Sequence, residues 1–233
     1  MKAIILAAGI GSRIGGRFPK ALIRLVTGKT VMEHQIEGLT DVMNPKDITV
    51  VVGFMKSMIM NAFPNLNFVE NADYRTTSTA KSLLLAFEQV GDGPVLFLEG
   101  DVVCDHRVFD RVVACKNSCM ATHEIPLGDE EMKYTTQGDG AINRLSKSLS
   151  NGEGEVLGVN KILAHERDPL LAHLRRCDND SFFESAIEMC IGDGIKILPV
   201  DVSDLYGVEI DFPEDLALAN RMLRKAGLCG PPE

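Results

Sequence analysis

Three things are scarce in this sequence, and each scarcity excludes a class of protein. No segment approaches the roughly 18 uninterrupted apolar residues of a membrane-spanning helix, so a membrane protein is not expected. The six cysteines form no CxxC pair and have no histidine-rich companion segment, so the sequence indicates neither a zinc site nor a disulfide framework. Positive charge is also scarce. The net charge of −9 argues against broad nucleic-acid binding and requires any anion site to be local.

The composition that remains is that of an ordinary globular protein. With 233 residues, 45% of them hydrophobic and 24% charged, the chain can bury a sizeable core, and we expect one domain over residues 1–233. The first apolar stretch, Ala3–Ala8, is too short for a signal-peptide core and leads directly into glycines, so we expect a cytoplasmic protein. The sequence leaves the oligomeric state open, with a homodimer among the alternatives.

Short runs rich in isoleucine and valine alternate along the chain with longer stretches of helical period. This alternation predicts an α/β fold, a Rossmann-like three-layer α/β/α arrangement with a mostly parallel mixed sheet. The expected strands are Lys2–Ala7, Ile48–Phe54, Asn67–Glu70, Val95–Glu99, Cys119–His123, Ile195–Val200 and Tyr206–Ile210. The expected helices run from Thr30 to about Val42, from Ser78 or Thr79 to about Val90, over Pro169–Arg175 and Ser181–Cys190, and onward from Pro213. Polar, glycine-punctuated stretches between about 132 and 165 predict a small hairpin insertion that can form a lid.

The chain opens with MKAIILAAGIGSRIGGRFPKALIRLVTGKT, which holds five glycines. A strand, a glycine-rich turn and then a helix commonly present backbone N–H groups to phosphate. Two familiar phosphate-binding motifs do not match this segment. The third glycine of the dinucleotide fingerprint G-x-G-x-x-G would fall on Ile14, and the first glycine of a Walker A motif would fall on Ile23.

What remains is the string Leu6-Ala7-Ala8-Gly9-x-Gly11-Ser12-Arg13, followed by Pro19-Lys20-Ala21-Leu22 and Gly28-Lys29. It resembles the signature of nucleotidyltransferases that activate sugar phosphates and related small phosphate esters. The resemblance implies that Lys20 and Arg13 are catalytic, with Lys20 placing charge at the α-phosphate. It also implies nucleotide binding by six residues of the string, which are Leu6, Ala7, Ala8, Gly9, Gly11 and Ser12. Their small side chains leave room for a base and ribose to lie against the backbone.

The segment VLFLEGDVVCD puts an apolar strand directly before Asp101, at the carboxyl edge of the sheet where open α/β folds bind ligands. In the resembled family an aspartate at this place holds Mg²⁺, and a second aspartate comes from a strand next to the last helix. Asp211 matches the second position, and two aspartates suffice because Mg²⁺ completes its shell with phosphate oxygens and water. The alternatives are that Asp101 caps a turn and that Asp211 caps the final helix.

The segment NADYRTTSTAKSLLLAF resembles N-x-x-Y-x-x-T-N-x-x-x-S-L, which belongs to the branch of the family that makes CDP-choline-like and CMP-phosphonate products. The resemblance implies that Asn71, Thr77, Ser78 and Ser82 bind the nucleotide and that Tyr74 binds the acceptor. Ser78 departs from the asparagine of that branch. The stretch Ser78-Thr79-Ala80 equally resembles the Gly/Asn-Thr-Ala stretch of sugar and isoprenoid members.

The resemblance to bacterial phosphocholine cytidylyltransferases extends further along the chain and implies that Lys147 and Glu184 lie at the acceptor pocket. An aromatic cage for a quaternary ammonium is best built with tryptophan, but the chain has no Trp and only three Tyr. Lys81, Lys147 and Lys161 instead favour a phosphonate or carboxylate acceptor. A primary amine balanced by Glu184 is the alternative.

These residues predict a CTP-dependent, Mg²⁺-requiring enzyme that transfers CMP to a small phosphonate or phosphorylated alcohol and releases pyrophosphate. No general base is needed, because the acceptor oxygen is already anionic at neutral pH. One alternative is a sugar-1-phosphate or molybdopterin nucleotidyltransferase that uses another triphosphate. Another is a noncatalytic nucleotide-binding regulatory module, against which the retention of Arg13, Lys20, Asp101 and Asp211 argues.

Overall fold

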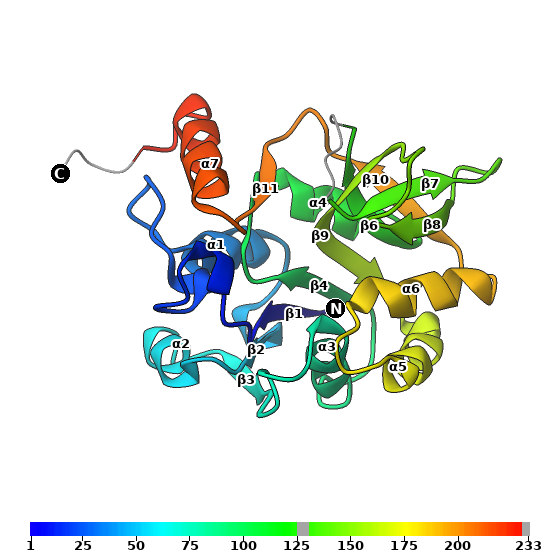
Figure 1. Ribbon diagram of the computed structural model, residues 1–233, viewed down its shortest axis with the longest axis horizontal. Coiled ribbons are helices and arrows are strands. Elements are labelled where there is room, and N and C mark those ends of the chain that lie inside the picture. Colours follow the sequence, from blue (N-terminus) through cyan, green and yellow to red (C-terminus); the bar gives the residue numbers. More distant parts are fainter. Residues whose placement is uncertain (125–130, 230–233) are drawn as a thin grey trace.

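The computed structural model describes residues 1–124 and 131–229. They form a sheet that is covered by helices on both faces (Figure 1). Seven of the nine strands in this sheet follow the order β10-β6-β9-β4-β1-β2-β3, with β7 and β8 attached at β9, and β5 and β11 form a separate ribbon. The strands are β1 (Lys2–Ala7), β2 (Ile48–Val52), β3 (Asn67–Glu70), β4 (Val95–Glu99), β5 (Val102–Cys104), β6 (Ser118–His123), β7 (Lys133–Thr136), β8 (Ile142–Ser146), β9 (Gly154–Ile162), β10 (Ile197–Asp201) and β11 (Gly207–Glu209). The helices are α1 (Val31–Val42), α2 (Lys56–Ala62), α3 (Thr79–Phe87), α4 (Arg107–Ala114), α5 (Arg167–Arg176), α6 (Phe183–Gly192) and α7 (Pro213–Lys225).

Strand β1 shows why the sheet lies between two helical layers. It is almost fully buried, as is typical of a strand between parallel neighbours, here β2 and β4. Ile4 and Leu6 pack with apolar side chains of α3, α5 and α6 on one face, whereas Ala3 and Ile5 pack with those of α1, α2 and α4 on the other. The predicted α/β fold with a mostly parallel mixed sheet is therefore confirmed, and the expected element bounds hold to within three residues.

The region between 132 and 165 differs from the expected insertion. β7 and β8 form a hairpin, but β9 lies inside the main sheet, antiparallel to both β4 and β6. Gly158, Asn160 and Lys161 interrupt the apolar run that marks a buried strand, so the sequence pattern concealed the role of β9. The insertion therefore comprises the β7–β8 hairpin alone, and its role as a lid stays a prediction, as does the single-domain assignment.

Three elements, α2, α4 and β5, were not expected from the sequence. The N-cap of α2 is Met55, a non-glycine residue with φ of 46°, and α4 begins after His106 without a side-chain cap. The start of α2 therefore carries no recognisable capping signal, whereas Asp105, one residue before the N-cap of α4, accepts the N–H of Arg107 through its Oδ1 at 3.0 Å. No helix in the described ranges is both long and apolar enough to cross a membrane.

The β5–β11 ribbon positions two acidic residues at the carboxyl edge of the sheet. Asp101 directly precedes β5, and Asp211 is the second residue after β11. The ribbon is antiparallel, with Val102 opposite Glu209, and the backbone N–H of Ile210 donates to the carbonyl of Asp101 at 3.0 Å. This register brings Asp101 and Asp211 together although they are far apart in the sequence.

Candidate active site

A cavity of about 460 Å³ lies at the carboxyl edge of the sheet, next to the ends of β1 and β4. It is bounded by the loop after β1, the loop before α3, the β5–β11 ribbon, the segment after β8 and the start of α6. The predicted site residues that line it are Leu6, Ala7, Gly9, Gly11, Ser12, Arg13, Lys20, Tyr74, Thr77, Ser78, Asp101, Lys147, Glu184 and Asp211. Motifs that are distant in the sequence thus meet at one cavity.

Gly11 allows the loop after β1 to fold closely over Lys20. Its φ is +63°, a conformation that favours glycine, and a Cβ atom at this position would lie 2.6 Å from Cγ of Lys20. The loop then turns into a short 3₁₀ helix, Ser12–Ile14, which begins beside the cavity. A larger residue at position 11 would therefore displace the lysine that faces the cavity.

Lys20 is held between two aspartates. Its Nζ lies 2.7 Å from Oδ2 of Asp101 and 2.6 Å from Oδ1 of Asp211. Burial by itself would lower the pKa of Lys20, but the attraction and hydrogen bonds of the two carboxylates outweigh it and raise the pKa above its ordinary value. Nη1 of Arg13 lies 3.5 Å from Asp211, so a second cation borders the same carboxylate. The loop therefore presents fixed positive charge to an anion in the cavity.

The donor set of Asp101 and Asp211 fits the predicted Mg²⁺ site. Both carboxylates converge on one point, which the Lys20 ammonium occupies, and Mg²⁺ is commonly bound by one or two carboxylates together with substrate phosphates. Asp211 does not cap α7, because the N-cap position is held by Phe212. Oδ2 of Asp215 accepts the backbone N–H groups of Asp211 and Phe212. The side chain of Asp211 is thus directed to the cavity and to the two cations beside it.

Three predicted nucleotide-binding residues lie behind the cavity wall. Asn71 is buried, and its amide donates to Oγ1 of Thr77 at 3.0 Å and to Oγ of Ser82 at 2.9 Å. Ala8 is buried in the apolar layer beneath the loop, and its carbonyl accepts the N–H of Phe54. The structure thus assigns Asn71 and Ser82 to holding the loop before α3, which carries Tyr74 and Thr77, rather than to lining the cavity.

Two cavity-lining glutamates, Glu99 and Glu209, were missed in the sequence. A Cβ atom on Gly158 would lie 2.7 Å from Oε1 of Glu209 and 3.4 Å from Oε2 of Glu99, so both carboxylates approach the same glycine. Burial and then the neighbouring carboxylates raise the pKa of both glutamates well above the ordinary value. Each glutamate precedes a predicted metal ligand by two residues, and this strand-like spacing was the available signal.

Glu184, at the start of α6, is a third glutamate at the cavity. Its side chain is buried, and its Oε2 has no hydrogen-bond partner among the described residues. Burial raises the pKa of Glu184 to about 7, although the nearby positive charge of Lys147 opposes the shift. The ammonium of Lys147 lies 5.4 Å from the ring centroid of Phe182, within the range of a cation–π contact. One wall of the cavity therefore carries a carboxylate oxygen that accepts no hydrogen bond from the described residues.

Replacing Glu184 with glutamine is expected to stabilise the folded protein at pH 8. The folded-state pKa of about 7 exceeds the ordinary value of 4.5, so the folded state loses stability as pH rises through 7. The shift in pKa lowers the free energy of unfolding of wild type by up to about 3 kcal/mol above pH 7. The difference in unfolding free energy between Glu184→Gln and wild type should therefore narrow to below about 1 kcal/mol at pH 5. Urea unfolding at both pH values tests this, with Glu188→Gln on the same helix as control, since Glu188 pairs with Arg144 at the surface. Equal stability of wild type and Glu184→Gln at pH 8 would contradict it.

The fold and cavity define a class of protein, the α/β nucleotidyltransferases, in which a glycine-rich loop with basic residues faces aspartates across a cleft. A family model described as the MobA-like NTP transferase domain matches residues 3–177, so the chain belongs to this family of nucleotidyltransferase domains. Enzymes of this family generally use a divalent metal ion.

Individual relatives share part of their length with this chain. The chain is 27% identical, over 92% of its length, to CMP-5'-(3-aminopropyl)phosphonate synthase of Streptomyces rubellomurinus. It is 36% identical, over 89% of its length, to the bifunctional protein GlmU of Francisella philomiragia. The chain covers only 37% and 49% of these two proteins. The structure of CTP:phosphocholine cytidylyltransferase from Streptococcus pneumoniae matches with a TM-score of 0.77 and 19% identity, over 95% of this chain and 98% of that one. That likeness shows a shared fold.

Proposed function

We propose that this nucleotidyltransferase transfers CMP from CTP to a small phosphonate or phosphorylated alcohol that also carries an amine, with release of pyrophosphate. The position of Lys20 is the observation that supports the transfer reaction most directly. Lys20 lies under the glycine-rich loop and within 2.7 Å of both Asp101 and Asp211, in a cavity of about 460 Å³. Cationic side chains, loop N–H groups and paired aspartates in one cavity are the groups that a phosphoryl-type transfer requires.

In the proposed reaction the protein mainly aligns and neutralises charge. Ser12, Arg13 and the N–H groups of the loop bind the β- and γ-phosphates, and Lys20 contacts the α-phosphate. The anionic acceptor oxygen then attacks phosphorus, and pyrophosphate leaves in line, so no residue has to remove a proton. Asp101 and Asp211 would hold Mg²⁺, which supplies further positive charge to the phosphates when bound.

Three glutamates at the cavity support an acceptor with a cationic end, because an ammonium group beside them would stabilise their ionised forms. Glu99, Glu184 and Glu209 all line the cavity, and the free oxygen of Glu184 offers a hydrogen-bond acceptor to an ammonium group. The relative from Streptomyces rubellomurinus is named for a CMP-aminopropylphosphonate product, which supports the same class of acceptor. Lys147, near Glu184, offers a contact to the anionic end.

A matrix of substrates tests this proposal. Pyrophosphate release should be fastest with CTP among the four triphosphates and with 2-aminoethylphosphonate or 3-aminopropylphosphonate among the acceptors. Propylphosphonate, which lacks the amine, should react about 10–100-fold more slowly, as expected for the loss of one charged hydrogen bond. Phosphocholine should react more slowly than the aminoalkyl phosphonates, because the cavity lacks tryptophan. A sugar 1-phosphate as best acceptor, or another triphosphate as best donor, would support the sugar-phosphate alternative instead.

The residues assigned to the acceptor are tested by two variants. Glu184→Gln should remove most of the preference for 3-aminopropylphosphonate over propylphosphonate, and Lys147→Ala should raise KM for both acceptors. Neither variant should change KM for CTP by more than about twofold, because the glycine-rich loop binds the triphosphate. The control is again Glu188→Gln. An unchanged acceptor preference in Glu184→Gln would remove this glutamate from the acceptor site.

A further inference from the structure

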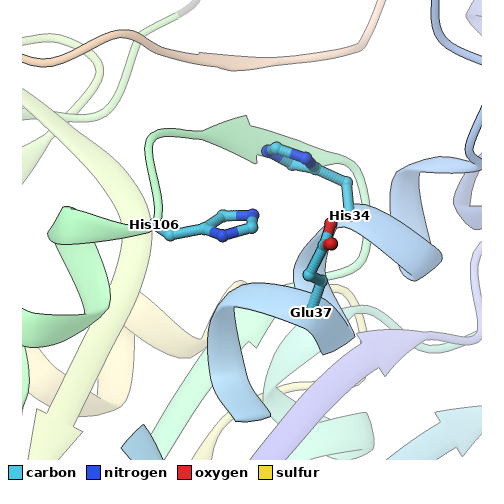
Figure 2. A group of neighbouring side chains, drawn as sticks. All are labelled: His34, Glu37 and His106. Carbon is cyan, nitrogen blue, oxygen red and sulfur yellow. The ribbon is translucent and has the colours of Figure 1, made fainter. Parts of the chain in front are cut away.

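A cluster of three metal-binding side chains lies outside the cavity, between α1 and α4. His34 and Glu37 are one turn apart on α1, and His106 directly precedes α4, with all three side chains directed toward one another (Figure 2). One ligand atom from each residue lies within 4.8 Å of the other two. None of the three is among the described residues that line the cavity, so the nucleotide site does not account for them.

The hydrogen bond of His34 leaves one of its nitrogens ready to bind a metal ion. Nε2 lies 2.8 Å from the carbonyl oxygen of Cys104, and only a protonated nitrogen can donate to a carbonyl. Nδ1 therefore carries the lone pair. Burial lowers the pKa of His34, which keeps the ring neutral. Metal-bound histidines typically donate the N–H of their other ring nitrogen to a backbone carbonyl or a carboxylate in this way.

His106 has the complementary arrangement. Its Nδ1 lies 3.6 Å from Oδ2 of Asp41, and this negative charge favours the tautomer with the proton on Nδ1. Its Nε2 is buried and has no hydrogen-bond partner among the described residues. A buried nitrogen without a partner is costly, so this lone pair points to a ligand.

We propose that His34, Glu37 and His106 bind one divalent transition-metal ion, with Zn²⁺ as the best match to their chemistry. Two imidazoles and a carboxylate suit zinc, whereas Mg²⁺ prefers oxygen ligands alone. Ligand atoms about 2.1 Å from one tetrahedral ion lie about 3.4 Å apart. The three ligand atoms of the cluster lie within 4.8 Å of one another, so the side chains need to close by up to about 1.4 Å. Three protein ligands leave a coordination position for water.

Glu37 has a competing partner, Lys29, beside the cluster. Its Oε2 lies 2.5 Å from Nζ of Lys29, and both side chains are nearly half exposed, so the ion pair is weak and easily exchanged for a metal ion. The exposed side chain of Glu37 also gives the ion a route from solvent. The bound ion joins α1 to the start of α4 next to the end of β5, the strand that follows Asp101, and so stabilises the base of the ribbon.

Competition with a chromophoric chelator tests the proposal on the full-length chain. Wild type should bind one Zn²⁺ per chain at this cluster, and Zn²⁺ should raise its Tm. His106→Gln and Glu37→Gln should each weaken this affinity by more than about tenfold, since even the loss of a neighbouring partner of a ligand costs 10–100-fold. Glu37 is exposed, so its variant should fold normally if His106→Gln does not.

Two further variants separate this site from others. His165→Gln changes a histidine that is 74% exposed and lies outside the cluster, and Asp211→Asn changes the nucleotide site. Both should keep the affinity of the cluster for Zn²⁺ within about twofold of wild type. With Co²⁺ in place of Zn²⁺, wild type and both of these variants should share one visible absorption band, and Glu37→Gln should change it. Failure of wild type to bind Zn²⁺ at micromolar concentration, or unchanged affinity in both cluster variants, would overturn the proposal.

Discussion

Replacing Lys20 with alanine is expected to lower the rate of nucleotidyl transfer by about 10²–10³-fold, the usual effect of removing one preorganised group that stabilises developing charge. The two aspartates fix the ammonium beside the glycine-rich loop before substrate arrives, at 2.6 and 2.7 Å. The loss should appear in kcat more than in KM for the triphosphate, because the interaction strengthens toward the transition state. Pyrophosphate release under saturating substrates measures it.

The folded state of Lys20→Ala needs a separate check, since the variant leaves Asp101 and Asp211 facing each other without the cation between them. Circular dichroism and thermal unfolding should show a folded protein. Lys56→Ala is a matched control, because Lys56 pairs with Glu70 at the surface, away from the cavity, and its loss should leave turnover unchanged. Near-normal turnover in a folded Lys20→Ala protein would exclude Lys20 from the mechanism.

Asp101→Asn and Asp211→Asn are each expected to lower turnover by about 10²-fold at limiting Mg²⁺ and to raise the Mg²⁺ concentration needed for half-maximal rate. An amide keeps the size of the side chain but lacks the negative charge that the ion requires. Each variant also weakens the hold on Lys20, since the carboxylates are 2.7 Å and 2.6 Å from its ammonium. Rates measured across a series of Mg²⁺ concentrations separate weaker metal binding from weaker positioning of Lys20. Excess Mg²⁺ compensates for weaker metal binding but does not reposition Lys20.

A matched control for the aspartate variants is Asp92→Asn, which changes an exposed residue in the loop before β4. It should behave as wild type across the whole Mg²⁺ series. If Asp101→Asn and Asp211→Asn also show wild-type rates with unchanged half-saturation, the two carboxylates do not bind the metal ion. Equal losses at every Mg²⁺ concentration would instead assign their effect to positioning Lys20.

The sequence predicted the parts of the site that depend on short, local motifs. The run Leu6–Ala8 followed by glycines indicated a buried strand and a phosphate-binding loop, and an apolar strand placed Asp101 at the sheet edge. Both follow from the way parallel strands end at one edge of a sheet. The motifs of the glycine-rich loop, the loop before α3 and the two aspartates all contribute residues to the lining of the cavity.

Other parts depend on contacts that no local pattern encodes. Strand β9 pairs antiparallel with both β4 and β6, which are distant from it in the sequence. Its glycines and polar residues break the apolar pattern from which a buried strand is predicted. Asn71 belongs to the motif that predicted nucleotide binding, yet its side-chain amide donates hydrogen bonds to Thr77 and Ser82 within the protein. The cluster near α1 combines His34 with His106 across 72 positions of sequence, so a search for locally spaced metal ligands does not find it.

The β5–β11 ribbon also bears on when the protein becomes active during synthesis. Lys20 and Asp211 are separated by 191 residues, and at about 5–20 residues per second a ribosome needs about 10–40 s to add them. The glycine-rich loop and β1 through β4 emerge long before Asp211. A nascent chain can therefore form the parallel half of the sheet early, but Asp101 and Asp211 come together only after the last strand closes the ribbon.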